Sequence, residues 1–259
     1  MPEGDTIFRV AARLRPALAG RTLVALEAPR ATGPRPAVGC LITAVDPVGK
    51  HLLVRFADGI VLRTHLRMTG SWHLYRPGER WPRPAHQMRA VVAVDDWVAV
   101  CFSAPVVAFE RVPAVGHLGP DLCRPDTDLD ECLRRMAELV DPAAEVADVL
   151  LDQRIASGVG NVYKSEACFA ARINPRSPIG AVPEDGRRRL LATAARQLRA
   201  NLQGGARTTT AGPPGSLAVY GRAHLPCRRC ATAVVVARTG PHGRSTYWCP
   251  ACQPLERAA

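Results

Sequence analysis

The pattern of hydrophobic and polar positions predicts that the chain changes from strands to helices near its middle. Short apolar runs recur over roughly the first 110 residues, and turn signals such as Asp58-Gly59 and Asp95-Asp96 separate them. Many short antiparallel strands within such a length indicate a β-sandwich or a barrel. The expected strands are Thr22–Glu27, Leu41–Val45, His51–Phe56, Ile60–Leu66, Trp72–Tyr75, Arg89–Val94 and Val98–Phe102.

A different, helical periodicity occurs at the start of the chain and in its second half. One apolar face predicts a helix that begins within the first residues and stops at Gly20. A Pro- and Gly-rich stretch at Val112–Cys123 indicates a linker, and Gly204–Gly215 indicates a mobile loop. The first helix is marked by Ile7, Val10, Ala11, Leu14 and Leu18, and the later helices are expected at Leu129–Val140, Ala144–Asp152, Val162–Ala171 and Glu184–Leu202.

Two pairs of cysteines near the end of the chain carry the strongest local signal. The pairs Cys227/Cys230 and Cys249/Cys252 have CxxC spacing and can present four thiolates tetrahedrally to Zn²⁺. Between them, two strand-like runs surround Gly240-Pro241-His242-Gly243, which predicts a β-hairpin. A site made only of cysteine is closed, so we expect one structural zinc per chain rather than a catalytic metal.

The composition and charge of the chain limit the kinds of protein that it can be. The 259 residues are long enough for two or three domains, and the formal net charge of +11 favours a polyanionic partner. Of the 34 basic residues, only Lys50 and Lys164 are lysines. Arginine supplies the positive charge almost everywhere else, so we expect these two amines to have specific roles, because only an amine can lose its proton near neutral pH. Scattered, odd-numbered cysteines and the absence of a long apolar run are typical of a cytosolic protein without a membrane span.

The first residues combine an amine with an acid. Removal of Met1 would leave Pro2 as the N-terminus, and its secondary α-amine titrates near pH ~8. The adjacent Glu3 carboxylate would lie at the positive end of the first helix. An uncharged amine can attack a sugar carbon to give a Schiff base. The simpler alternative is that Pro2 and Glu3 only start a helix.

A glycine-containing turn in the second half offers a possible anion site. Ser157-Gly158-Val159-Gly160-Asn161 precedes a helix, whose first N–H groups could bind a DNA phosphate. The alternative is a tight turn with a capping Asn161. Because the protein is basic, a helix, a turn and a second helix make DNA binding plausible.

Taken together, these stretches resemble the formamidopyrimidine-DNA glycosylase/endonuclease VIII family of base-excision repair enzymes. The resemblance extends along the whole chain in family order. It rests on Pro2-Glu3-Gly4, Gly49-Lys50-His51-Leu52, His65-Leu66-Arg67-Met68-Thr69-Gly70, Leu118-Gly119-Pro120-Asp121, Asp152-Gln153-Arg154, Gly158–Tyr163, Val219-Tyr220-Gly221-Arg222 and Arg244–Cys249.

The resemblance implies an α+β fold of four parts. Residues 1–112 would form an N-terminal helix plus an antiparallel β-sandwich, and residues 113–125 a linker. Residues 126–222 would form a helical helix–two-turn–helix domain, and residues 223–259 a β-hairpin zinc finger. DNA would lie in a cleft between the domains.

The same resemblance implies roles for individual residues. Pro2 would be the nucleophile, Glu3 the acid that protonates the sugar ring oxygen, and Lys50 a lysine near the phosphates and the reacting sugar. Asn161 and Arg244 would clamp the phosphates that flank the lesion. Lys50 as an idle surface charge is the less favoured alternative.

Met68 matches the position of the apolar wedge that fills the space of an extruded nucleotide. The alternative interpretation is that Met68 is an ordinary core residue. Arg67, Thr69 and Gly70 around it indicate a turn instead.

These features predict a monomeric, bifunctional DNA glycosylase and abasic-site lyase that cuts the strand by β,δ-elimination. The start at Pro2-Glu3-Gly4-Asp5-Thr6 is closer to the endonuclease VIII branch, and the loop interpreted as Cys101–Val107 lacks the Arg and Phe of the formamidopyrimidine branch. Oxidised pyrimidines are therefore the expected lesions. The alternative functions are a non-catalytic, zinc-stabilised binder of damaged or abasic DNA and, less favoured, a structural role.

Overall fold

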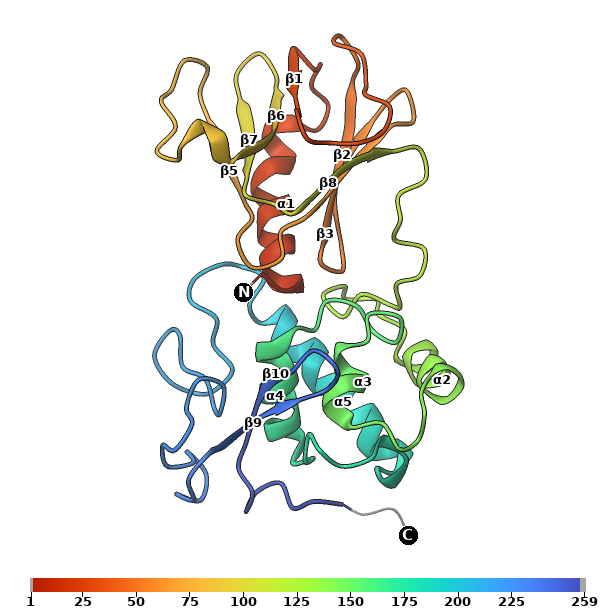
Figure 1. The fold of residues 1–259 in the computed structure, drawn as a ribbon, viewed down its shortest axis with the longest axis vertical. Coiled ribbons are helices and arrows are strands. Elements are labelled where there is room, and N and C mark those ends of the chain that lie inside the picture. The colour runs from red at the N-terminus through yellow and green to blue at the C-terminus, as the bar shows by residue number, and fades with distance from the viewer. Residues whose placement is uncertain (1, 257–259) are drawn as a thin grey trace. The chain divides into compact units, whose positions relative to one another are not determined.

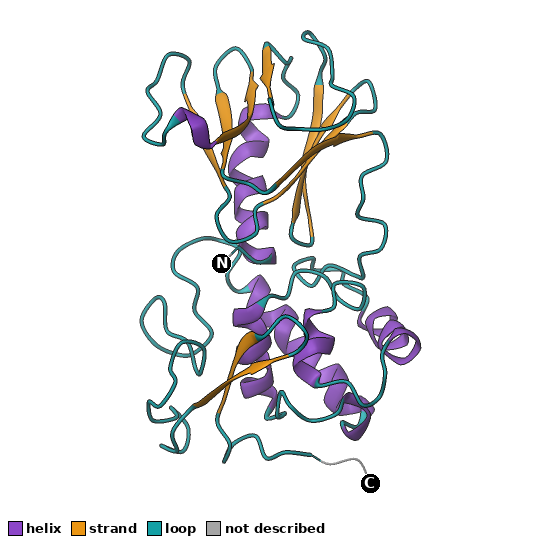
Figure 2. Cartoon of the chain, viewed as in Figure 1, coloured by secondary structure: helices purple, strands orange, loops and turns teal. Residues whose placement is uncertain are grey.

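The computed structural model describes residues 2–256, and the chain divides after Gly116 into two compact units. Figure 1 follows the chain from the first unit, in red to yellow, into the second, in green to blue. Figure 2 shows that strands dominate the first unit and helices the second. The expected change from strands to helices is confirmed, and so is the mixed α+β class.

The first unit is built around helix α1, Gly4–Leu18. Ile7, Ala11, Leu14 and Leu18 have no exposed surface, and they recur at the spacing of one helical face. A large apolar side chain buried in this way contributes roughly 2 kcal/mol relative to an exposed one. The predicted apolar face is thus the face that packs into the core of this unit.

Two antiparallel four-stranded sheets complete the first unit. One has the strand order β1-β6-β7-β5 and the other β2-β3-β4-β8. Buried residues from both sheets and from α1 form a single apolar cluster, as in a sandwich. The strands are β1 Ala25–Glu27, β2 Ile42–Val48, β3 His51–Phe56, β4 Val61–His65, β5 Ser71–Tyr75, β6 Met88–Ala93, β7 Val98–Phe102 and β8 Val106–Glu110.

The eighth strand corrects the sequence-based interpretation of this region. Val106–Glu110 pairs with β4 along its whole length, so the expected loop Cys101–Val107 is wrong at both ends. Only Ser103–Pro105 connects β7 to β8, and Ser103 has a positive φ of 51°. Pro105 directly before the run obscured a strand that begins one residue later.

The second unit contains four α-helices among its described residues. They are α2 Leu129–Leu139, α3 Val146–Leu151, α4 Asn161–Ala171 and α5 Glu184–Arg199. The ends of each lie within three residues of those predicted. Helix α4 is buried over almost its whole length, because it packs against α3, α5 and the hairpin strand β10.

The hairpin consists of β9, Val235–Thr239, and β10, Arg244–Trp248. It belongs to the second unit, where strand β10 lies on α4. Gln253 fixes the following knuckle: its Oε1 accepts from the Cys249 N–H at 2.9 Å, and its Nε2 donates to the Ile173 carbonyl at 2.8 Å. The finer division at residues 113, 126 and 223 stays a prediction, and residues 257–259 lie outside the described part.

None of the helices described is both long and apolar enough to cross a membrane.

Candidate functional site

The start of α1 holds two of the predicted catalytic residues. Glu3 is the N-cap residue, with extended backbone at φ −123°, and its carbonyl accepts from Thr6 N at 3.0 Å and Ile7 N at 3.2 Å. The Glu3 side chain is fully buried and makes no capping hydrogen bond to the helix. Pro2 beside it is half-buried, and Met1 lies outside the described residues.

A second buried acid follows in the same helical turn. Asp5 has no exposed surface and accepts from Thr6 Oγ1 at 3.2 Å and from Arg9 Nη2 at 3.4 Å. The amino end of α1 therefore gathers two carboxylates where the helix dipole favours negative charge.

Lys50 lies in the tight turn between β2 and β3, beside two histidines. Gly49, with φ 56°, makes this turn possible. His51 begins β3 and pairs with His65 at the end of β4, and their ring centroids are 4.8 Å apart. Sequence reasoning did not select these histidines as site residues. Their signal was present, since His51 directly follows Lys50 and His65 ends the neighbouring strand.

The environment of His65 fixes its protonation state. Burial is the main cause that lowers the pKa of His65 to about 4, and the positive charges of Arg67, Lys50 and Arg63 contribute to the same shift. Its Nδ1 accepts from the Arg67 backbone N–H at 3.1 Å, so the proton of the neutral ring is on Nε2. At neutral pH this imidazole is therefore a neutral hydrogen-bond donor next to Lys50.

Met68 projects from the turn between β4 and β5. Its side chain is 67% exposed, which excludes the alternative of a core residue. The turn is rigid around it: Thr69 Oγ1 donates to the Ser103 carbonyl at 2.9 Å, and Gly70 N to Leu66 O at 2.8 Å. A methyl group at Gly70 would lie 2.7 Å from that carbonyl oxygen, so only glycine fits.

In the second unit, Asn161 is the first residue of α4, after Gly160 as N-cap. The preceding turn is held by Gln153, whose Oε1 accepts from Gly158 N at 3.1 Å and whose Nε2 donates to the Leu151 and Val159 carbonyls at 2.8 and 3.1 Å. Gly158 has φ 103°, which a residue with a side chain rarely adopts. The turn thus presents the amino end of α4 in a fixed orientation.

Asn161 and Arg244, expected to act together, are neighbours across the hairpin. Asn161 Nδ2 donates to the carbonyl of Ser245 at 2.8 Å, and Arg244 precedes Ser245 in β10. Arg244 is exposed, and it lines a cavity of about 440 Å³ together with Arg154 and His242. Asp148 and Asp152 line the same cavity, and Asp152 forms an ion pair with Arg154 at 2.6 Å, so the hollow at the tip of the hairpin has mixed charge.

The four predicted zinc ligands converge. The sulfur atoms of Cys227, Cys230, Cys249 and Cys252 all lie within 4.8 Å of one another. The Sγ–Sγ distances of 3.4 Å for Cys230–Cys252, 3.5 Å for Cys230–Cys249 and 3.9 Å for Cys227–Cys252 are too long for disulfides. Zinc–sulfur bonds of ~2.3 Å in a tetrahedron require sulfur atoms about 3.8 Å apart, so the cluster fits this metal.

Glu166 is a buried acid that sequence reasoning missed. Its carboxylate accepts from the backbone N–H groups of Ala218 at 2.7 Å and of Val219 and Tyr220 at 2.8 Å, and from the Thr209 hydroxyl. These bonds attach two segments to α4. Thr209 belongs to the expected mobile loop Gly204–Gly215, and Ala218–Tyr220 follow that loop. A buried carboxylate whose donors are backbone N–H groups produces no hydrophobic periodicity and no motif spacing, so the sequence alone does not reveal it.

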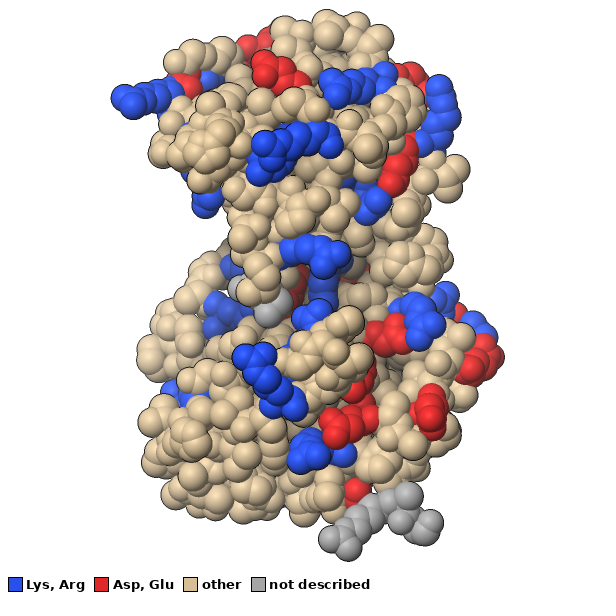
Figure 3. Space-filling view, in the orientation of Figure 1, with Lys and Arg blue, Asp and Glu red and all other residues tan. Residues whose placement is uncertain are grey.

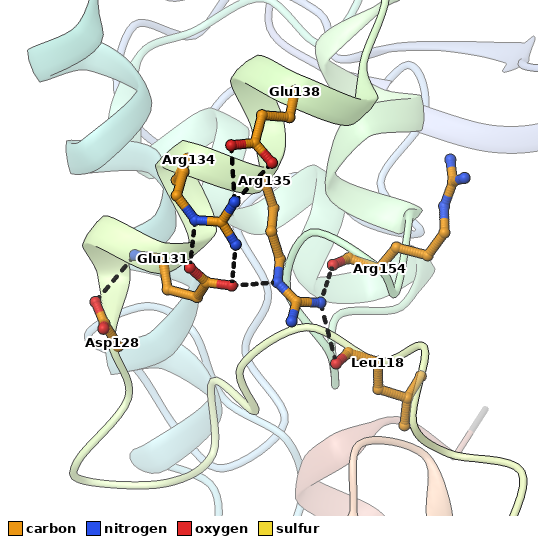
Figure 4. A network of polar contacts seen from close by, with 7 residues as sticks. All are labelled: Leu118, Asp128, Glu131, Arg134, Arg135, Glu138 and Arg154. Atoms are coloured by element: carbon orange, nitrogen blue, oxygen red, sulfur yellow. Dashed lines mark hydrogen bonds and ion pairs between the residues drawn. The ribbon is translucent and has the colours of Figure 1, made fainter.

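Helix α2 secures the start of this unit through charged side chains (Figure 4). Glu131 accepts from Arg134 and Arg135, whose hydrogen bonds lower the Glu131 pKa to about 2. Arg135 Nη1 also donates to the carbonyls of Leu118 at 3.2 Å and Arg154 at 3.1 Å. The segment after Leu118 and the turn before Gly158 are thereby joined to one helix.

Basic side chains occur on the visible face of both units in Figure 3, and acidic side chains are mixed with them around α2. The predicted site residues form two sets, one in each unit. Pro2, Glu3, Lys50 and Met68 belong to the first, and Asn161, Arg244 and the four cysteines belong to the second.

Two family models match the chain. The formamidopyrimidine-DNA glycosylase N-terminal domain matches residues 1–105, and the formamidopyrimidine-DNA glycosylase H2TH domain matches residues 118–212. Together they cover most of the sandwich and the helices, including the glycine-containing turn.

Curated relatives align over nearly the full length. A probable endonuclease 8 2 of Streptomyces coelicolor is 44% identical over 98% of this chain and 94% of its own. The DNA-(apurinic or apyrimidinic site) lyase Nei2 of Mycolicibacterium smegmatis is 38% identical over 98% and 99%. Formamidopyrimidine-DNA glycosylases follow, including one from Thermus thermophilus that is 31% identical over 98% of both chains.

A solved structure has the same fold. The MutM (Fpg) protein from Thermus thermophilus superimposes with a TM-score of 0.79 and 29% identity, over 98% of this chain and 99% of the other. The fold, the matching models and the full-length relatives agree with one another. The chain belongs to the formamidopyrimidine-DNA glycosylase/endonuclease 8 family.

Proposed function

We propose that the protein is a bifunctional DNA glycosylase and abasic-site lyase of base-excision repair, which excises oxidised bases and then cuts the strand. The observation that carries this proposal is the start of α1. There a fully buried Glu3 carboxylate follows Pro2 at the positive end of a helix. A Schiff-base mechanism needs an acid beside the N-terminal amine, whereas a DNA-binding protein without turnover needs neither group.

The chemistry begins with the amine of Pro2, once Met1 has been removed. At pH 7 about a tenth of an α-amine with a pKa near 8 is uncharged. Its lone pair attacks C1′ of the damaged nucleotide as the bond from C1′ to the base breaks, and the base leaves with the proton that the Pro2 nitrogen gives up. Glu3 protonates the ring oxygen as the sugar opens, and a Schiff base between Pro2 and C1′ results.

Strand cutting follows from the Schiff base. Loss of a C2′ proton expels the 3′ phosphate in β-elimination, and a second elimination expels the 5′ phosphate. Lys50 supplies positive charge for a phosphate near the reacting sugar. The neutral ring of His65, with its proton on Nε2, offers a further donor beside Lys50.

DNA binding uses residues of both units. Asn161 at the amino end of α4 and the exposed Arg244 of the hairpin donate to phosphates that flank the lesion. Met68, exposed on a rigid turn, enters the stack in place of the extruded nucleotide. The net charge of +11 favours association with the polyanion.

The four-cysteine cluster binds one structural zinc ion in this proposal. The ligand type and the sulfur–sulfur distances support zinc, and four protein ligands leave no open position for catalysis. The metal holds β9 and β10 so that Arg244 stands next to the amino end of α4.

We expect oxidised pyrimidines such as thymine glycol and 5-hydroxyuracil to be preferred over 8-oxoguanine. The connection between β7 and β8 is only Ser103–Pro105, and it contains no Arg that could hydrogen-bond the base opposite the lesion. Arg89 lies near this loop, but its guanidinium donates to the carbonyls of His86 and Met88. Two relatives that align over the full length are named endonuclease 8 2 and Nei2.

Single-turnover excision on defined duplexes tests both the activity and the preference. We expect faster release of thymine glycol than of 8-oxoguanine paired with cytosine, and little dependence on the opposite base. Faster release of 8-oxoguanine would contradict the preference. Tight binding without release of any base would instead support the alternative, a non-catalytic binder of damaged or abasic DNA.

A further inference from the structure

Lys164, one of only two lysines in the chain, is completely buried in α4, one helical turn after Asn161. Its Nζ donates to Asn161 Oδ1 at 2.7 Å, to Thr246 Oγ1 at 2.6 Å and, at a longer 3.4 Å, to the carbonyl of Ser245. Each of these oxygen atoms is a suitable acceptor for an N–H group of an ammonium ion. All three belong to residues at the junction of α4 with the hairpin.

The Lys164 ammonium group and the Ser245 carbonyl together determine the orientation of the Asn161 amide. An ammonium group can only donate, so it must face Oδ1 rather than Nδ2. The Nδ2 group then points to the Ser245 carbonyl, to which it donates one N–H at 2.8 Å. The second N–H of this group is the donor that the proposed function assigns to a phosphate. With the amide turned by 180°, the phosphate would meet an oxygen.

The charge of Lys164 has a second consequence at the same place. Positive charge near the amino end of a helix is unfavourable, because it adds to the positive end of the helix dipole. Full burial of the Lys164 side chain also removes the hydration of its ammonium group. An anion bound at Asn161 would be attracted by this charge and would offset both costs. The arrangement is therefore suited to a helix end that receives a phosphate.

We propose that Lys164 is a positioning residue for phosphate binding: it fixes the Asn161 amide in its donating orientation and supplies buried positive charge behind it. This inference rests on the proposed function, since it concerns the phosphate contact of Asn161. The Lys164 amine is enclosed between α4 and β10, so it acts through Asn161 and touches no substrate itself.

The test is a double-mutant cycle in binding to a duplex that contains a tetrahydrofuran abasic-site analogue, measured by fluorescence anisotropy. Lys164→Met keeps the length of the side chain and removes the amine. We expect it to weaken binding about tenfold, the cost of one charge-assisted hydrogen bond. In an Asn161→Ala background the same change should weaken binding less than about threefold, because the oriented amide is already absent and only the attraction of the buried charge is lost.

Two further variants separate positioning from a general loss of structure. In an Arg244→Ala background, Lys164→Met should keep its full effect of about tenfold, because the Arg244 phosphate contact is independent of the amide. Thr246→Val removes one hydroxyl acceptor from the hairpin but leaves the bond between Lys164 and Asn161. It should bind within about threefold of the unmodified protein and keep one zinc ion per chain, although its melting temperature should fall, because the buried Thr246 hydroxyl also bonds to Thr239 at 2.6 Å.

The possible results are distinguishable. If the effects of Lys164→Met and Asn161→Ala are additive, or if Thr246→Val weakens binding as much as Lys164→Met, Lys164 only attaches the hairpin and the inference is wrong. If the unmodified protein does not prefer the abasic-site duplex over an undamaged one, the proposed function itself fails, whatever Lys164 does.

Discussion

Replacing Glu3 by Gln should slow the release of damaged bases by a factor of about 10²–10⁴, the usual contribution of a general acid. The amide has the size of the carboxylate but cannot protonate the sugar ring oxygen. A ready-made abasic site is already an aldehyde in equilibrium with its ring form, so its cutting needs this acid much less. The measurement compares single-turnover rates on thymine glycol duplex and on abasic-site duplex.

The control for Glu3→Gln is Asp5→Asn. Asp5 is a second fully buried carboxylate in the same helical turn, and it bonds to Thr6 and Arg9 within the helix. We expect Asp5→Asn to change both rates to a similar extent, through stability alone. If Glu3→Gln also reduced both rates equally, Glu3 would have no specific role in base release.

Replacing Cys249 by Ser should remove the zinc ion and abolish measurable binding to abasic-site DNA. Cys249 is buried within the cluster, and its backbone N–H is held by Gln253. Zinc binding of this kind contributes on the order of 10 kcal/mol to folding, more than a small hairpin can lose. Without a folded hairpin, Arg244 loses its position, and so do Ser245 and Thr246, which bond to Asn161 and Lys164.

Metal analysis and anisotropy on the purified variant provide the measurement. Cys40→Ser is the matched control, because Cys40 is a partly exposed thiol far along the chain from the cluster. It should keep one zinc ion per chain and bind DNA normally. Normal DNA binding by a zinc-free Cys249→Ser protein would show that the metal does not organise the phosphate site.

Local sequence signals predicted most elements and the metal cluster. The apolar face of α1 and the spacing of the two CxxC pairs each follow from one short segment, so neither required knowledge of the rest of the chain. The strand β8 escaped because Pro105 and the nearby linker signals masked a short run. Pairing with β4 decides that this run is a strand, and pairing is not visible in the run itself.

The parts of the site that depend on tertiary contacts could not be derived from the sequence. Glu166 holds backbone N–H groups more than 50 residues away in the chain, at Ala218, Val219 and Tyr220. Lys164 stood out because lysine is rare here, yet only its contacts with Asn161 and Thr246 indicate what it does. The resemblance to the family identified Asn161, and the fold shows how its amide is oriented.

The proposed mechanism requires a covalent bond between the α-amine of Pro2 and the sugar. Borohydride reduction during the reaction with abasic-site DNA should trap a stable protein–DNA complex, since it converts the Schiff base of this secondary amine to a tertiary amine that cannot hydrolyse. Proteolysis and mass spectrometry of that complex should place the adduct on a peptide that begins with Pro2, with Met1 removed. An adduct on Lys50 or Lys164, or no trapped complex from a protein that cuts abasic sites, would contradict the mechanism.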